Sequence, residues 1–205
     1  MKFDIMCILE GKLFIQVCKK KVLSMAGMEK GQILLKKVYD EYKSIIARAG
    51  ELGPKDRMKS PYITCAYFIA LCRSMESYAS ADECYSLMED GLRKSKIFKA
   101  LNPSAKRYLS ESMYEKRLLW SENIDVLKYK NTWVAKVYPK CKEYDYGVDY
   151  LECGICKLCK DENVESLAKY LCKFDYLTAE IMGIKLSRTG TIANGSRYCD
   201  FRYLL

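Results

Sequence analysis

The chain has 205 residues, of which 50% are hydrophobic and 30% are charged, a balance typical of a folded globular domain. This length is enough to bury a sizeable core. The sequence contains no histidine, which excludes Ser-His-Asp and Cys-His catalysis and every zinc site that needs an imidazole ligand. Proton transfer would therefore depend on carboxylates, thiols, lysines, tyrosines or water.

The net charge of +9 favours an anionic substrate, which we expect to be small. The basic residues form no concentrated arm and no aromatic RNA-binding signature occurs, so we expect no nucleic-acid partner. We also expect no membrane partner, because no apolar run approaches the roughly 20 residues of a spanning helix. The N-terminus lacks an export signal and the eleven cysteines are odd in number, so we expect free thiols in the cytoplasm. The composition and charge of the sequence favour no particular oligomeric state.

The first clear element is a helix in the N-terminal part of the chain. From Gly31 to Ala49, apolar residues recur at helical spacing. Gly50 and the pair Gly53-Pro54 are expected to end this helix.

Three more helices are expected before residue 120. Ser60 as the N-cap and Pro61 as the first helical residue begin the second helix. Its buried face would consist of small and apolar side chains: Cys65, Ala66, Phe68, Ile69, Cys72 and Met75. The remaining two run over about 81–95 and from Pro103-Ser104 to about Leu119.

The pattern changes after residue 130. We expect strands over Thr132–Tyr138 and Asp145–Leu151, a helix over about Val164–Met182 that Gly183 ends, and strands over Ile184–Ala193 and Tyr198–Leu204. The fold class is therefore α+β, with N-terminal helices packed on a mostly antiparallel C-terminal sheet that contains an inserted helix. We assign residues 29–205 to one domain and treat residues 1–28 as an N-terminal extension.

Asn194-Gly195 is a strong hairpin signal between the last two strands. A two-residue turn there would pair Gly190 with Cys199 and Thr189 with Asp200. Cys199 would then face a residue without a side chain. Because neighbouring residues of a strand point to opposite faces, Cys199 and Asp200 could not both reach one pocket.

The cysteines of the last quarter of the chain allow three interpretations. Cys153, Cys156, Cys159 and Cys172 could hold zinc or an iron–sulfur cluster, although their spacing fits neither two CxxC knuckles nor a ferredoxin run. We therefore favour a site without metal or cofactor. Cys156 and Cys159 fit buried packing on a helix. Reversible disulfides, Cys153–Cys156 or Cys156–Cys159, would indicate a redox sensor.

Nucleophilic chemistry is the third interpretation. Cys153 stands beside Gly154 where a strand ends and a helical segment begins, and a helix N-terminus stabilises a thiolate. Cys172 and Asp175 are three residues apart on one helix and can line the same surface. Without histidine, Cys153 or Cys172 is the expected nucleophile and Asp175 the expected proton carrier.

The same residues carry a family resemblance. The order Cys153, Leu171-Cys-Lys-Phe-Asp175, Arg188-Thr-Gly-Thr-Ile-Ala-x-Gly195 and Cys199-Asp-Phe-Arg202 resembles the L-2-amino-thiazoline-4-carboxylic acid hydrolase family over about 145–203. The resemblance implies an α+β hydrolase that opens the ring of a cyclic amidine thioether. The bond that it cleaves would be a C–N or a C–S bond. It implies these catalytic residues: Cys153, Cys172, Asp175, Cys199 and Asp200.

A carboxylate on such a substrate would need a guanidinium, for which we expect Arg188 or Arg202, with Thr191 as a further substrate-binding residue. Cys156 and Cys159 depart from the family pattern. The leading hypothesis is thus a histidine-free thiol and carboxylate hydrolase. The alternative is a non-enzymatic cysteine-rich module that binds metal or a small ligand.

Overall fold

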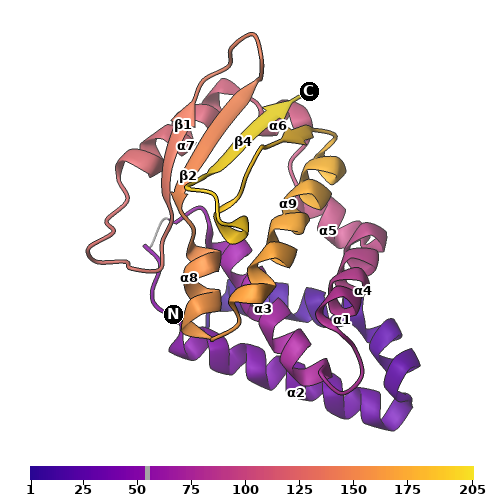
Figure 1. Cartoon of the computed structure of the whole chain (residues 1–205). Helices are drawn as coiled ribbons and strands as arrows, with labels where there is room; N and C mark the ends of the chain where they lie inside the picture. Colours follow the sequence, from indigo (N-terminus) through magenta and orange to yellow (C-terminus); the bar gives the residue numbers. More distant parts are fainter. Residues whose placement is uncertain (54–55) are drawn as a thin grey trace.

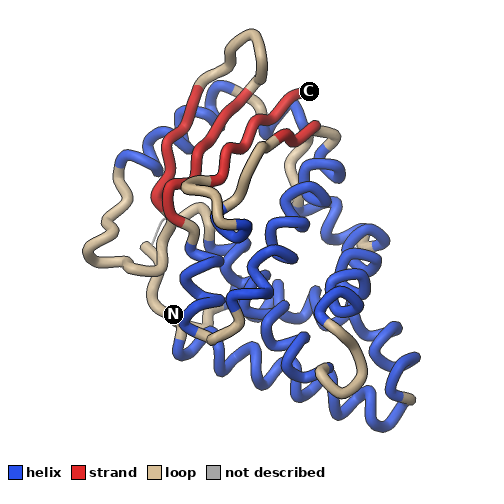
Figure 2. The backbone as a smooth tube through the Cα atoms, viewed as in Figure 1, coloured by secondary structure: helices blue, strands red, loops and turns tan. Residues whose placement is uncertain are grey.

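The computed structural model describes residues 1–53 and 56–205 and confirms the α+β fold. Helices form the N-terminal part, and a four-stranded antiparallel sheet lies at the other end of the molecule (Figures 1 and 2). Pro54, one of the expected helix breakers, lies outside the described residues. None of the helices in these two ranges is both long and apolar enough to cross a membrane.

Four helices build the larger layer: α1 (Ile5–Ala26), α2 (Met28–Arg48), α3 (Lys59–Met75) and α4 (Ala81–Lys94). The opening residues form α1, which packs against α2 and α4 and buries Cys7, Phe14 and Cys18. Gly27 separates α1 from α2 with a φ of 81°, a conformation that glycine adopts readily.

Helix α3 lies at the centre of this layer because its sequence is apolar on nearly every side. The expected face is buried apart from Cys72, which is half-buried. The expected cap is wrong by two residues: α3 begins at Lys59, its N-cap is Met58, and Ser60 lies within the first turn.

The single helix expected from residue 103 to 119 is broken into α6 (Ala105–Tyr108) and α7 (Glu111–Glu122), and α5 (Lys96–Leu101) precedes them. Ser104 does cap α6, since its side chain accepts a hydrogen bond from the Arg107 amide. Ser110 has an extended conformation and begins α7 as a second N-cap. This break turns α7 so that Arg117 reaches back to α6 and donates to the Tyr108 carbonyl at 2.8 Å.

The sheet has the order β1-β2-β4-β3, with β1 (Val134–Tyr138), β2 (Tyr146–Glu152), β3 (Lys185–Ser187) and β4 (Cys199–Leu204). The inserted segment between β2 and β3 forms α8 (Gly154–Asp161), a 3₁₀ turn (Glu165–Leu167) and α9 (Ala168–Met182). Gly183 ends α9 in the left-handed conformation, as expected. Helices α6, α7 and α9 cover one face of the sheet (Figure 1).

The hairpin differs from the expected one. Ser187 pairs with Arg202, the register that a two-residue turn predicts, but the β3–β4 ladder stops there. Residues 188–198 form a loop with a 3₁₀ turn over Ile192–Asn194, and Cys199 pairs with Tyr150 of β2 instead of Gly190. The expected notch above Cys199 is therefore wrong, because the loop folds back over the sulfur.

Candidate active site

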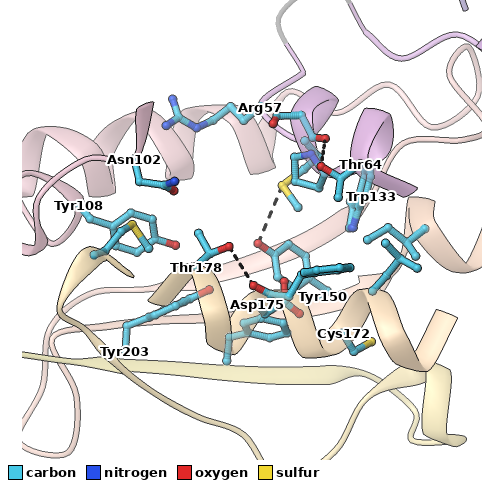
Figure 3. A pocket seen from close by; sticks show the side chains of 18 of the residues that line it. Arg57, Thr64, Asn102, Tyr108, Trp133, Tyr150, Cys172, Asp175, Thr178 and Tyr203 are labelled. Carbon is cyan, nitrogen blue, oxygen red and sulfur yellow. Dashed lines mark hydrogen bonds between the residues drawn. The ribbon is translucent and has the colours of Figure 1, made fainter. Parts of the chain in front are cut away.

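A cavity of about 460 Å³ lies between the helical layer and the covered face of the sheet. Cys153, Cys172, Asp175 and Cys199 all line it, together with residues from α3, α7 and β2. Figure 3 shows Cys172 and Asp175 at this cavity. Its volume falls in the range of about 300–1,000 Å³ that is usual for small-molecule sites. Three segments far apart in the sequence thus bring four of the five expected catalytic residues to one space.

Cys153 is the N-cap of α8, as the sequence pattern predicted. A Cβ atom on the next residue, Gly154, would lie 2.5 Å from the Asn131 carbonyl oxygen and 2.5 Å from the Trp133 ring, so only glycine lets α8 start here. A hydrogen bond with Cys156 and then burial raise the pKa of the Cys153 thiol well above its ordinary value. The amides at the start of α8 oppose this shift and favour the thiolate.

Cys172 and Asp175 lie on α9, and both are accessible from the cavity. Burial, and next the charge of Asp175, raise the pKa of Cys172 to about 12. Burial also raises the pKa of Asp175 to about 6, although the nearby Arg188 guanidinium pulls it down. Protein surrounds this carboxyl, yet 36% of its side-chain surface is open to the cavity. A carboxyl with these properties can exchange a proton near neutral pH.

Arg188 supports Asp175 from behind and does not line the cavity. Its Nη1 donates to Asp175 Oδ2 at 2.8 Å and its Nη2 donates to the Cys172 carbonyl at 2.5 Å. The guanidinium lies between the rings of Tyr176 and Phe201, with ring centres at 4.5 and 4.9 Å. Through these contacts, Arg188 connects α9 to the loop over residues 188–198.

The other expected residues of the hairpin point elsewhere. Asp200 accepts hydrogen bonds from the backbone amides of Thr189 and Gly190 and from the Thr189 hydroxyl, and lies outside the cavity lining. Arg202 binds Asp149 at 2.8 Å on the other face of the sheet. Thr191 is buried, and its hydroxyl has no hydrogen-bond partner in the described ranges.

Cys199 takes the inward position that the strand alternation predicted, opposite to that of Asp200. The amide of Ile192 donates to its sulfur at 3.1 Å, an unforeseen contact that the folded-back loop provides. Burial raises the pKa of Cys199 to about 11 in spite of this hydrogen bond.

Cys156 and Cys159 face the helical layer. Cys159 is fully buried, with its sulfur 3.8 Å from the sulfur of Cys65 on α3. Cys156 is half-buried and packs against the same core. Among the described residues, no three cysteine, aspartate or glutamate side chains are grouped so that they could hold a metal ion.

Two arginines of the cavity were not among the candidates from sequence. Arg57, just before α3, and Arg117, on α7, both line it. The sequence offered no signal for either, because both stand among ordinary polar residues of the helical half. Tyr150 of β2, whose hydroxyl faces Met58 at 4.0 Å, also lines the cavity and was not among the candidates.

Comparison with known proteins decides the family. The model of the L-2-amino-thiazoline-4-carboxylic acid hydrolase family matches residues 58–203. The chain belongs to this family. The match includes Arg117 and every cysteine and aspartate of the cavity, whereas Arg57 lies one residue before it. No curated protein and no solved structure matches the chain.

Proposed function

We propose that this member of the L-2-amino-thiazoline-4-carboxylic acid hydrolase family opens a small thiazoline-type ring at its amidine carbon with a thiol and a carboxylate. The observation that carries the proposal is that Cys172 and Asp175 on α9, Cys153 at the start of α8 and Cys199 on β4 line one cavity. The family's name supplies the substrate class and the hydrolase reaction. The residue types supply a histidine-free route to it.

In the first step, Asp175 accepts the proton of the Cys172 thiol while the sulfur attacks the amidine carbon. The addition converts the C=N bond into a single bond, and its nitrogen takes the proton from Asp175. Collapse of this adduct breaks a ring bond, C–N or C–S, and re-forms a C=N bond from a remaining amine, whose proton Asp175 transfers to the leaving nitrogen or sulfur. Every atom of the substrate remains attached to Cys172 at this stage. The carboxylate suits this task because its pKa of about 6 lets it exist in both forms near neutral pH.

In the second step, water adds to the same carbon and the Cys172 sulfur leaves with a proton. The product is a carbamoyl derivative of the opened ring, and the free thiol is restored. The reaction as written balances without an oxidant, a metal or another cofactor.

The remaining candidates have supporting roles in this proposal. Cys153 and Cys199 face the reacting carbon from α8 and β4, and their proton-bearing sulfurs can donate to the substrate. Asp200 orders the loop that carries Thr191 and Ile192. Arg188 keeps Asp175 in place, and Arg202 fixes the sheet from its far face.

We also propose a cytoplasmic location. All eleven cysteines lie in the described part of the chain, and each is a free thiol. A reducing compartment preserves this state, which the reaction requires of Cys172.

Separate replacement of single cysteines tests the proposal. We expect Cys172→Ala to abolish turnover of L-2-amino-thiazoline-4-carboxylate and Cys153→Ala to reduce it. Cys141→Ala is the matched control, because Cys141 is exposed on the β1–β2 connection and does not line the cavity. Full turnover by the Cys172 and Cys153 variants would refute the thiol mechanism. Stoichiometric zinc or iron in purified protein, lost on replacing Cys156, would favour the metal-binding alternative.

A further inference from the structure

Arg117 is a buried cation without a carboxylate partner in the described ranges. Only 7% of its surface is exposed, and it lines the cavity. Its Nη1 donates to the Tyr108 carbonyl, whereas its Nη2 has no hydrogen-bond partner among the described residues. A guanidinium stays charged in proteins, and burying a charge without a counter-ion is costly. This arrangement therefore leaves an unsatisfied strong donor within the wall of the cavity.

Aromatic rings hold Arg117 in place without neutralising it. The guanidinium carbon lies 4.0 Å from the ring centre of Tyr108 and 4.2 Å from that of Tyr146. Tyr146 in turn stacks on Tyr203 at 5.6 Å. Cation–π contacts of this kind orient the planar group and offset part of the cost of its burial. The guanidinium is thus held in a fixed orientation before any ligand arrives.

Arg57 is a second cation at the same cavity. Arg57 is exposed on its outer side, and its partial burial, and next the charge of Arg117, lower its pKa, so the two guanidinium groups are near enough to repel each other. Figure 3 shows Arg57 on the side of the pocket opposite to Asp175 and Cys172. Asp175 cannot compensate both arginines, because it is already paired with Arg188. The described lining therefore has an excess of positive charge at the end away from the thiols.

We infer that Arg117 and Arg57 form the carboxylate-binding end of the cavity, while Cys172 and Asp175 face the ring of the same ligand. The occupant is a small planar monocarboxylate, whose negative charge Arg117 and Arg57 compensate. The tyrosines around Arg117 provide flat apolar surfaces for the ring. The identity of the reacting ring rests on the proposed function, but the charge of the ligand does not. Arg188 and Arg202, which the sequence suggested for this task, keep their structural partners.

Calorimetric titration with two unreactive probes tests this inference apart from turnover. Thiazole-4-carboxylate carries the charge, and thiazole-4-carboxamide is its neutral analogue of nearly the same shape. We expect the carboxylate to bind at least 10-fold more tightly than the amide. Arg57→Gln and Arg117→Gln should each weaken carboxylate binding about 10- to 100-fold and leave amide binding unchanged. Arg107→Gln is the control, since Arg107 is exposed on α6 and outside the lining.

The outcomes separate the two proposals. Equal affinity for both probes, no binding of the carboxylate, or equal losses for both probes in the variants would overturn the inference. If Arg117→Gln does not fold, the exposed Arg57 still provides the test. Arginine-dependent carboxylate binding without any hydrolysis would leave this inference standing and reject the proposed reaction. Hydrolysis by a protein that binds both probes equally would reject this inference and leave the proposed reaction standing.

Discussion

Asp175 provides the sharpest test of the chemistry, because its protonation state should control the rate. Its pKa of about 6 exceeds the ordinary value of 3.8 because burial penalises the charge more than Arg188 stabilises it. If the carboxylate is the base for Cys172, kcat/KM must follow its ionised fraction. With this pKa, about one tenth is ionised at pH 5 and about nine tenths at pH 7, so we expect a rise of about tenfold between them.

Asp175→Asn removes the proton acceptor and keeps nearly the same shape. We expect kcat/KM at pH 7 to fall about 10²- to 10⁴-fold, the usual contribution of a general acid–base group, and the rise between pH 5 and pH 7 to disappear. The amide oxygen of the new side chain can still accept from Arg188, so we expect the variant to fold. Circular dichroism and thermal unfolding check this.

The assay follows substrate loss chromatographically at several pH values. Asp40→Asn is the matched control: Asp40 is also a helical aspartate paired with a cation, Lys43, but it lies exposed on α2. The control should keep the wild-type rate and pH profile. An Asp175→Asn enzyme with a rate within threefold of wild type, or with an unchanged profile, would refute the role of the carboxylate.

Three further substitutions test the architecture around the site. Gly154→Ala should abolish activity or folding, since the added methyl would collide with the Trp133 ring, and soluble protein with a wild-type rate would contradict this. Glu162→Gln should lower the free energy of unfolding by about 2 kcal/mol in urea, because this buried carboxylate pairs with two arginines that are themselves part-exposed. Burial alone would raise the pKa of Glu162, but the two arginines hold it below 4.5. The stability that Glu162 contributes is therefore complete at neutral pH and is lost on acidification below that value. A Glu162→Gln variant that unfolds with the same acid midpoint as wild type would contradict this contribution. Cys159→Ala should cost about 1 kcal/mol of stability and leave kcat/KM unchanged, and a loss of activity at equal folding would show that this thiol has a catalytic role.

Helical spacing predicted α2, α3 and α4 well, because each buries one continuous face or is apolar throughout. The break between α6 and α7 was missed, although two caps, Ser104 and Ser110, stand six residues apart in the sequence. The Ser104 side chain caps α6, and the Ser110 hydroxyl donates to the Arg107 carbonyl at 2.8 Å, so local hydrogen bonds replace those of a continuous helix. The hairpin register was right, but the turn was not, since the loop gains hydrogen bonds to Asp200 and Cys199 that a two-residue turn could not make.

The candidate site was predicted from sequence only in part. The motif residues Cys153, Cys172, Asp175 and Cys199 were recognisable because they carry the family resemblance. Arg57 and Arg117 were not recognisable, because an arginine that binds a ligand and one that supports a carboxylate look alike in a sequence. Arg188 and Arg117 differ in whether the folded chain gives them a carboxylate partner, and this depends on contacts between distant segments.

The proposed mechanism requires that Cys172 becomes covalently attached to the substrate during turnover. Rapid mixing of purified full-length chain with L-2-amino-thiazoline-4-carboxylate, followed by acid quench and intact-mass measurement, tests it directly. We expect a transient increase equal to the mass of one substrate molecule, localised to Cys172 by peptide mapping and absent in Cys172→Ala. Substrate turnover with no such adduct, or with the adduct on a cysteine outside the cavity, would contradict it.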